Sequence, residues 1–274
     1  MANLRNNLIF AQPGIINRDY EGEITEPGSS VRILSIGRVN IGDYTKNTDF
    51  SAGPQILDDA SQSFQVNRAR YFNFYVDDVD GAQRRPQIMN ASMSESAFAL
   101  ANDIDGYVAG KYGEAGVTIG TDASPKLVGL GTTDSNGYEL LVDISTALDE
   151  QNCPPDGRYC AVPPWFYGLL LKDQRFTSFG TPQNRATIQN GIIGTAAGLT
   201  ILRSNQVATK VTGQYTNYKI LAGHERAITY ADQINKTEAY RPQLRFGDAV
   251  KGLALYDCKV VRPSLLLCMT ARQA

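Results

Sequence analysis

Apolar and polar residues alternate with a period of two in two stretches near the start of the chain. Residues 30–33 place Val and Ile between polar neighbours, and the alternation returns at residues 64–66. Residues 42–60 between them are polar and turn-rich. Two strands joined in this way predict a projecting hairpin, and because a lone hairpin is marginally stable in water, we expect its partner on another molecule. Residues 1–30 show little pattern and are expected to form an extended arm rather than a packed element.

A helical period follows the strongly β-prone run at residues 71–76. Pro86 suits the first position of a helix. From there, apolar residues recur at spacings of three and four: Met89, Met93, Ala97, Leu100, Ile104, Tyr107 and Val108. Few helix breakers occur before Gly113, so the pattern predicts the longest helix of the chain at about 86–112, roughly 40 Å long. The methionine stripe is interpreted as core.

The remaining pattern mixes shorter helices and strands. Asn136 can cap a second helix, with Glu139 as its capping-box partner, and Pro163 and Pro164 begin a third helix at 165–171. A turn-rich loop is expected at 173–190, and strands are expected near 159–162, 192, 199–202, 219–222 and 249–261. Because strands and helices follow no strict βαβ order, the predicted fold class is α+β.

Composition and charge exclude several classes of protein. The net charge of −2 argues against a strongly basic nucleic-acid binder. His224 is the single histidine, so a metal site with two imidazoles is excluded. The longest nearly uncharged stretch, 190–202, is too short to span a bilayer. The first residues lack the apolar region of a signal peptide, so we expect the chain to stay in a cytoplasm.

Candidate chemistry is sparse. Asp77, Asp78 and Asp80 could hold a divalent cation, although acidic residues also favour the approach to a helix amino terminus, which is the preferred interpretation. No nucleophile elbow, phosphate-binding loop or Cys-x-x-Cys spacing occurs, so we predict no catalytic residue and no cofactor. Cys153 and Cys160 bracket a turn and could pair; free thiols are the default, and the question stays open.

Several stretches, in order along most of the chain, resemble the major capsid protein of tailed bacteriophages. They are NRDYEG (17–22), DYTKNT (43–48), YFNF running into DDVD (71–80), VPPWFYGLL (162–170), and LAGH (221–224) through GLALY (252–256) to VRP (261–263). The resemblance implies a Hong Kong 97-type capsid fold, with an amino-terminal arm, an extended loop hairpin, a peripheral domain with a long spine helix, and an axial domain.

The resemblance also implies a division of the chain. The arm would be 1–30, the first part of the peripheral domain 31–124, the axial domain 125–240 and the return to the peripheral domain 241–274. Within the first part, the extended loop would be about 37–66 and the spine helix about 86–112.

Two groups of residues become candidates for contact between subunits. On the extended loop, the charged residues expected to meet a neighbour's peripheral domain are Arg38, Asp43, Lys46 and Asp49. In the loop after the helix at 165–171, the small and amide residues expected around five-fold and six-fold axes are Ser178, Gly180 and Gln183.

The implied function is structural. The chain would self-assemble from hexamers and pentamers into the icosahedral shell that encloses the genome of a tailed double-stranded DNA phage. It would be assembled in the host bacterial cytoplasm and then reside in the virion. Its expected partners are other copies of itself, a portal, scaffolding and decoration proteins, and, weakly and non-specifically, the packaged DNA, with no membrane and no cofactor. The alternatives are an encapsulin-like nanocompartment shell and a metal-dependent enzyme.

Overall fold

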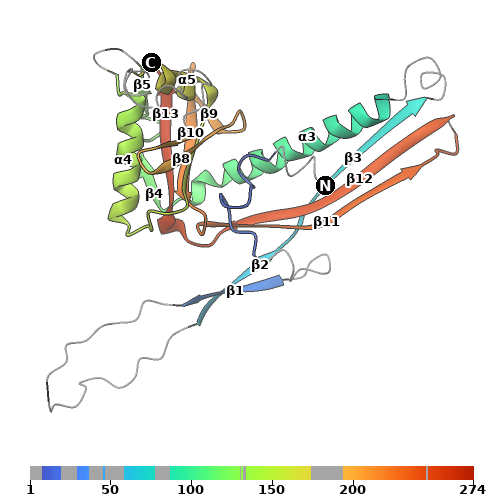
Figure 1. Ribbon diagram of the computed structural model, residues 1–274, viewed down its shortest axis with the longest axis horizontal. Coiled ribbons are helices and arrows are strands. Elements are labelled where there is room, and N and C mark those ends of the chain that lie inside the picture. Colours follow the sequence, from blue (N-terminus) through green and yellow to red (C-terminus); the bar gives the residue numbers. More distant parts are fainter. Residues whose placement is uncertain are drawn as a thin grey trace.

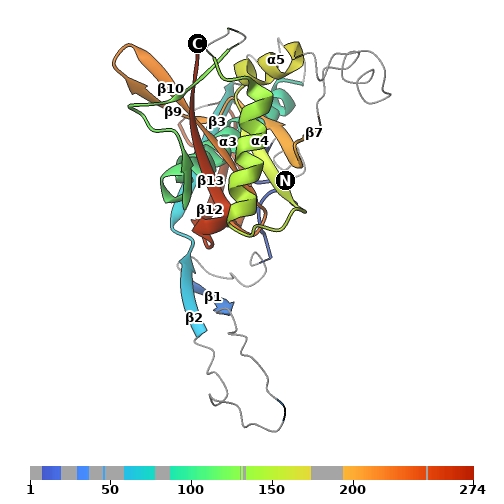
Figure 2. The same cartoon turned by 90° about the vertical axis from the view of Figure 1, so that its left-hand side faces the viewer.

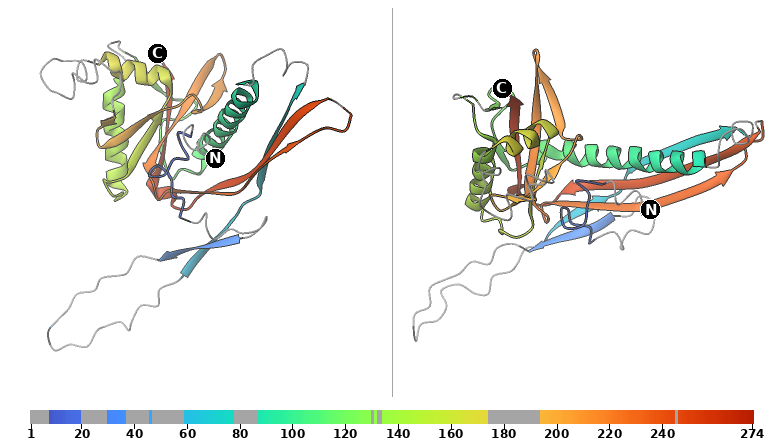
Figure 3. Two further views of the ribbon diagram at one scale, coloured as in Figure 1. Left: turned by 45° about the vertical axis from the view of Figure 1, so that its right-hand side comes forward. Right: turned by 45° about the horizontal axis from the view of Figure 1, so that its top comes forward.

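The protein divides into a compact unit and an elongated unit, which meet at the carboxyl-terminal end of one long helix (Figure 1). The structure is a computed structural model and describes residues 8–19, 30–36, 46, 59–77, 87–129, 131, 134–173, 194–244 and 246–274. A two-stranded hairpin projects away from both units (Figure 3).

The compact unit is built on an eight-stranded mixed sheet of described residues, in which the main path runs β4-β13-β10-β6-β8-β7, β5 pairs with β13, and β9 pairs with β10. Its strands are β4 (Val117–Ile119), β5 (Lys126–Val128), β6 (Arg158–Val162), β7 (Thr195–Ala196), β8 (Leu199–Arg203), β9 (Ala208–Thr212), β10 (Tyr215–His224) and β13 (Leu266–Gln273). The predicted strands at 159–162, 199–202 and 219–222 are confirmed as parts of β6, β8 and β10. The strand expected near 192 lies outside the described residues.

Two helices cover the compact sheet (Figure 2). Helix α4 (Gly137–Glu150) begins where predicted, since the Asn136 side chain accepts a hydrogen bond from the Tyr138 backbone N–H at 3.0 Å. Its buried side chains recur at helical spacing: Leu140, Leu141, Ile144 and Leu148. Helix α5 (Pro164–Lys172) has proline at its first position, as predicted, and buries Phe166 and Leu170.

The elongated unit is a three-stranded antiparallel sheet with one helix along it. The sheet order is β11-β12-β3, from β11 (Ile228–Tyr240), β12 (Gly247–Val260) and β3 (Arg68–Asp77). Helix α3 (Gln87–Ala109) lies along this sheet and continues into the short helix η2 (Gly110–Glu114) (Figure 1). A second short helix, η3 (Pro263–Leu265), precedes β13. The long helix and the strand at 249–261 are therefore confirmed.

Helix α3 is a core element only at its carboxyl-terminal end. Ile104 and Val108 are fully buried, whereas Met89 and Met93 are only partly buried. The interpretation of the methionine stripe as core is therefore wrong for the first half of the helix. That half lies beside the long sheet, beyond the reach of the compact unit's side chains.

The projecting hairpin is formed by β1 (Ser30–Ile36) and β2 (Asp59–Gln65). They pair antiparallel with Ile36 opposite Asp59, so the connection between them is 37–58. The expected hairpin is present. The extended loop was expected at about 37–66, and the second strand of the hairpin, β2, occupies residues 59–65 of that range.

The amino-terminal segment differs from the expected extended arm, because residues 8–19 are packed. Leu8, Phe10 and Ala11 are at most 1% exposed and belong to the main core. They fill the junction of the two units, where Asp105 of α3 accepts hydrogen bonds from the backbone N–H groups of Ile9, Phe10 and Ala11. These long-range partners leave no periodic signal in the segment itself.

The course of the last third also differs from expectation. The return to the elongated unit, expected at 241–274, already begins at Ile228, where β11 starts to pair with β12. The final strand, β13, then re-enters the compact sheet between β10 and β4. Alternation predicts that a segment is a strand, but not which sheet receives it.

We predict that Gly223→Ala in β10 destabilises the fold by about 1–3 kcal/mol, because the added Cβ would lie 2.7 Å from the Leu265 carbonyl oxygen in a closely packed sheet. Denaturant unfolding followed by circular dichroism measures this change. Gly168→Ala in α5 is the control: its Cβ would meet nothing within 4 Å, and alanine favours a helix by about 1 kcal/mol. Equal stability of the two variants would contradict the packing argument.

Candidate interaction surfaces

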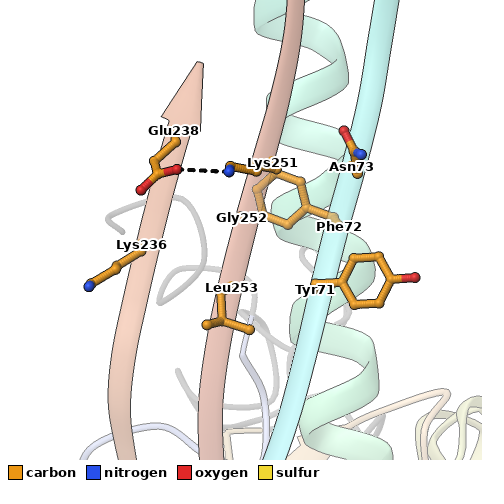
Figure 4. Close-up of a pocket in the computed structure, with 8 residues that line it drawn as sticks. All are labelled: Tyr71, Phe72, Asn73, Lys236, Glu238, Lys251, Gly252 and Leu253. Atoms are coloured by element: carbon orange, nitrogen blue, oxygen red, sulfur yellow. Dashed lines mark ion pairs between the residues drawn. The ribbon is translucent and has the colours of Figure 1, made fainter. Parts of the chain in front are cut away.

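One face of the long sheet is left uncovered by the residues that the structure describes. On β3, Arg68 and Arg70 both reach Asp103 of α3, so this set of alternate residues faces the helix and the other set faces away. Strand register adds residues of β12 and β11 to the second set, which we call the open face: Tyr71, Asn73, Lys236, Glu238, Tyr240, Lys251 and Leu253. Two cross-strand rows run through it, Lys236–Leu253–Tyr71 and Glu238–Lys251–Asn73 (Figure 4).

The open face combines exposed aromatic surface with fixed charges. The Tyr71 side chain is 81% exposed. Lys251 Nζ lies 3.0 Å from Glu238 Oε2 and 5.4 Å from the centre of the Tyr240 ring. Hydrogen bonding to Lys251 lowers the pKa of Glu238 below its ordinary value. Exposed tyrosine beside ordered polar groups is typical of protein–protein contacts.

The connection between β11 and β12 carries the most exposed apolar side chains of the described residues. Leu244 is 97% and Phe246 85% exposed, and we call 241–246 the hairpin tip. The tip is held in place, because Tyr75 Oη donates a hydrogen bond to the Phe246 carbonyl oxygen at 2.5 Å. Gly247 allows the close approach of the strands, since a Cβ there would lie 2.3 Å from the Val76 carbonyl oxygen.

A charged network fixes helix α3 over the long sheet. Arg68 Nε donates to Tyr256 Oη at 3.1 Å, Tyr256 donates in turn to Asp103, and Arg70 Nε lies 3.0 Å from Asp103 Oδ2. Burial acts to raise the pKa of Asp103, but the hydrogen bond from Tyr256 and the charge of Arg68 outweigh it and lower that pKa below the ordinary value. The Arg68 guanidinium also lies 4.3 Å from the centre of the Tyr107 ring.

Of the seven residues proposed from the sequence, only Lys46 lies within the described residues, where it is exposed in a turn. The others lie outside the described residues: Arg38, Asp43, Asp49, Ser178, Gly180 and Gln183. The sequence analysis missed Tyr71, Leu244 and Phe246. The signal for the last two was present, since two large apolar residues stand in the turn-rich sequence RPQLRFG (241–247) between two strands.

Of the three carboxylates considered for a metal site, the structure describes only Asp77. Asp77 lies at the end of β3, where its Oδ2 is 3.0 Å from Tyr75 Oη, while Asp78 and Asp80 lie outside the described residues. Among the described residues, no group of three or more His, Cys, Asp and Glu side chains could hold a metal ion. In the same part of the chain, no helix is long and apolar enough to cross a membrane.

The four cysteines are buried free thiols, so Cys153 and Cys160 do not pair. Burial raises the pKa of Cys160 to about 12 and that of Cys268 to about 11. Burial also lowers the pKa of His224 below its ordinary value, and its Nδ1 accepts a hydrogen bond from the Arg226 backbone N–H at 3.1 Å. These groups serve packing, because protonated thiols and a buried imidazole are poor nucleophiles and bases.

Comparisons with known proteins give one consistent result. A family model described as phage capsid protein matches residues 59–262. No curated protein matches the sequence. The solved structure of Mycobacterium phage Che8 is similar with a TM-score of 0.72 and 25% identity, covering 93% of this chain and 88% of that one.

Two further structures share the fold. The capsid of Cyanophage P-SCSP1u has a TM-score of 0.69 at 17% identity, covering 94% of this chain and 86% of its own. The capsid of Ralstonia phage GP4 has a TM-score of 0.66 at 12% identity, covering 94% of this chain and 87% of its own. The predicted Hong Kong 97-type fold is therefore confirmed.

Proposed function

The chain belongs to the phage capsid protein family, and on this premise we propose how its surfaces meet in a shell. It is a structural major capsid protein of a tailed phage, and its copies assemble into the icosahedral shell of the virion. The nanocompartment alternative is not favoured, because the matching family model is described as phage capsid protein and the similar structures of Che8 and P-SCSP1u are those of phages. The family is structural, and a metal-dependent reaction has no support among the described residues.

We assign the compact unit the role of the axial domain and the elongated unit that of the peripheral domain. The single observation that supports this arrangement best is the open face of the long sheet, with an 81%-exposed tyrosine in each subunit. A subunit with a sheet face that the described residues leave uncovered, and with a separate projecting hairpin, has surfaces to bury against its neighbours. The arm, expected at 1–30, then includes a packed part at 8–19.

The open face suits the charged hairpin of an adjacent subunit. It presents both signs of charge, from Lys236, Lys251 and Glu238. The hairpin connection also carries both signs, from Arg38, Asp43, Lys46 and Asp49. Complementary rim charges fix register and partner choice more than affinity, which suits a contact repeated in every capsomer.

Several finer roles belong to this proposal. We infer that assembly takes place in the bacterial cytoplasm, with a portal, scaffolding and decoration proteins as partners. Contact with packaged DNA is weak and non-specific, because a net charge of −2 offers few phosphate contacts. A container that is filled and later emptied does not need tight DNA binding.

The assembly itself is tested with the full chain. Size-exclusion chromatography with light scattering, followed by electron microscopy, is expected to show closed particles in the megadalton range. A species that stays monomeric under all assembly conditions would contradict the proposal. Tight binding of duplex DNA by unassembled subunits at physiological salt would contradict only the proposal that contact with DNA is weak.

The hairpin tip provides a test at residue level. We predict that Leu244→Ser with Phe246→Ser sharply reduces particle yield, because two exposed apolar side chains on an ordered tip are candidates for buried contacts between subunits. The unfolding free energy of the subunit is expected to change by less than about 0.5 kcal/mol, since both side chains are exposed. Val211→Ser, which removes another exposed apolar side chain on β9, is the control and is expected to assemble normally.

A second test concerns the loop expected at 173–190. We propose that copies of this loop meet around the five-fold and six-fold axes, with Ser178, Gly180 and Gln183 in the contact. Ser178→Asp would then place five or six carboxylates close together, and we predict loss of capsomers with little change in subunit stability. Ser178→Asn is the matched control without charge. Normal assembly of the aspartate variant would exclude this position from the axes.

A further inference from the structure

The packed amino-terminal segment, residues 8–19, crosses the junction of the two units, and we call it the strap. At its first end, three successive backbone N–H groups point at one carboxylate of α3. Asp105 Oδ2 accepts from Ile9 at 2.7 Å, and Oδ1 accepts from Phe10 at 3.0 Å and Ala11 at 3.3 Å. Asp105 is only 1% exposed, so these bonds are made in a dry environment.

The other end of the strap is held by the start of β11. The Asn17 backbone N–H donates to the Ile228 carbonyl oxygen at 3.1 Å, and the Asn17 carbonyl accepts from the Tyr230 N–H at 2.9 Å. Arg18 Nη2 lies 3.0 Å from Asp232 Oδ2, and its Nη1 donates to the Ala11 carbonyl oxygen at 3.0 Å. Arg18 therefore ties the strap both to β11 and to itself.

The strap contacts both units: it is hydrogen-bonded to α3 and β11 of the elongated unit, and its Asn17 N–H also donates to the Glu225 carbonyl oxygen at 3.0 Å, directly after β10 of the compact sheet. Helix α3 and strand β11 both leave the junction to form the elongated unit, and the strap is bonded to each of them (Figure 1). Its apolar side chains are packed in the same core as the base of α3. Opening the strap would therefore remove its bonds to the elongated unit together with its packing in the core that it shares with the compact unit.

We propose that the strap is a clamp that fixes the angle between the compact and elongated units, with Asp105 as the residue that positions it. The clamp is a property of the single subunit. A role of the clamp in setting the curvature of the shell would rest on the proposed function. The clamp itself is therefore tested with unassembled subunits, so that a failure to form particles does not affect the result.

The carboxylate also makes the clamp sensitive to pH. Burial raises the pKa of Asp105 to about 6, and the three backbone N–H bonds oppose this shift only in part. The charged groups of the elements around it are already engaged. On α3, Asp103 pairs with Arg68 and Arg70; on the strap, Arg18 pairs with Asp232 of β11. His224 ends β10, Glu225 and Arg226 lie between β10 and β11, and none of these groups is among the causes of the Asp105 shift.

The sign of the pH effect follows from linkage. With the strap closed, Asp105 has a pKa above its ordinary 3.8, so the closed state binds the proton more tightly than the open state. The stabilisation is complete below that ordinary value and is lost as the pH rises through about 6. From pH 5 to pH 7, the equilibrium constant for opening of the strap is expected to increase about tenfold.

Hydrogen exchange tests the clamp directly in the full-length subunit. After correction for intrinsic rates, the amides of 9–11 are expected to exchange about tenfold faster at pH 7 than at pH 5. Asp105→Asn removes this pH dependence, and Asp105→Ala accelerates exchange at both values. Asp143→Asn, the same change on an exposed helical carboxylate of α4, keeps the wild-type behaviour. A pH-independent wild type, or an Asp105→Asn variant that keeps the dependence, would overturn the role of Asp105.

The angle between the units needs its own measurement. The four native cysteines are buried, so spin labels can be placed selectively at Val142→Cys on α4 and Phe98→Cys on α3, two partly exposed positions. The distance distribution between the labels is expected to be narrow in the wild-type background and to broaden with Asp105→Ala. An unchanged distribution, with exchange of 9–11 accelerated, would show that the strap opens without setting the angle.

Discussion

Within the described part of the chain, the long three-stranded sheet is covered by a helix on one face and by no further layer on the other. Helix α3 packs over the side that carries Arg68 and Arg70, and the other side, with Tyr71 and Leu253, stays open. A monomer with this architecture exposes apolar surface that water disfavours. In the arrangement proposed above, association with further copies would remove that surface from water, and the incomplete burial in one subunit would supply part of the driving force for the shell.

The sequence predicted those parts of the fold whose signals are local. The Asn136 cap, the proline start of α5 and the alternation of β12 each depend on residues close together in the chain, and each was found where expected. The strap was missed because its contacts with Asp105 join residues more than ninety positions apart. The methionine stripe of α3 was wrongly interpreted as core, because an apolar helix face gives the same sequence pattern whether it packs in a buried core or against a sheet that stays partly exposed.

The sequence predicted that the protein has surfaces for contact between subunits, but not which residues of the long sheet are exposed. Resemblance directed attention to charged residues of the hairpin connection, and Lys46 is the one that the described residues include. The exposed residues of the long sheet depend on strand order and register, since Tyr71, Leu253 and Lys236 come together only when β3, β12 and β11 pair. Their sequence positions are too far apart for a local pattern to group them.

The length of the β11–β12 hairpin has a mechanical consequence. Thirteen residues of β11 extend about 40 Å from the junction, at roughly 3.3 Å per residue. A rotation of about 5° at the base would then displace the far end by about 4 Å, close to the spacing of neighbouring strands. The hairpin thus acts as a lever arm, and a small rotation permitted by the contacts near Ile228 is amplified into a large displacement of surfaces that those contacts never touch.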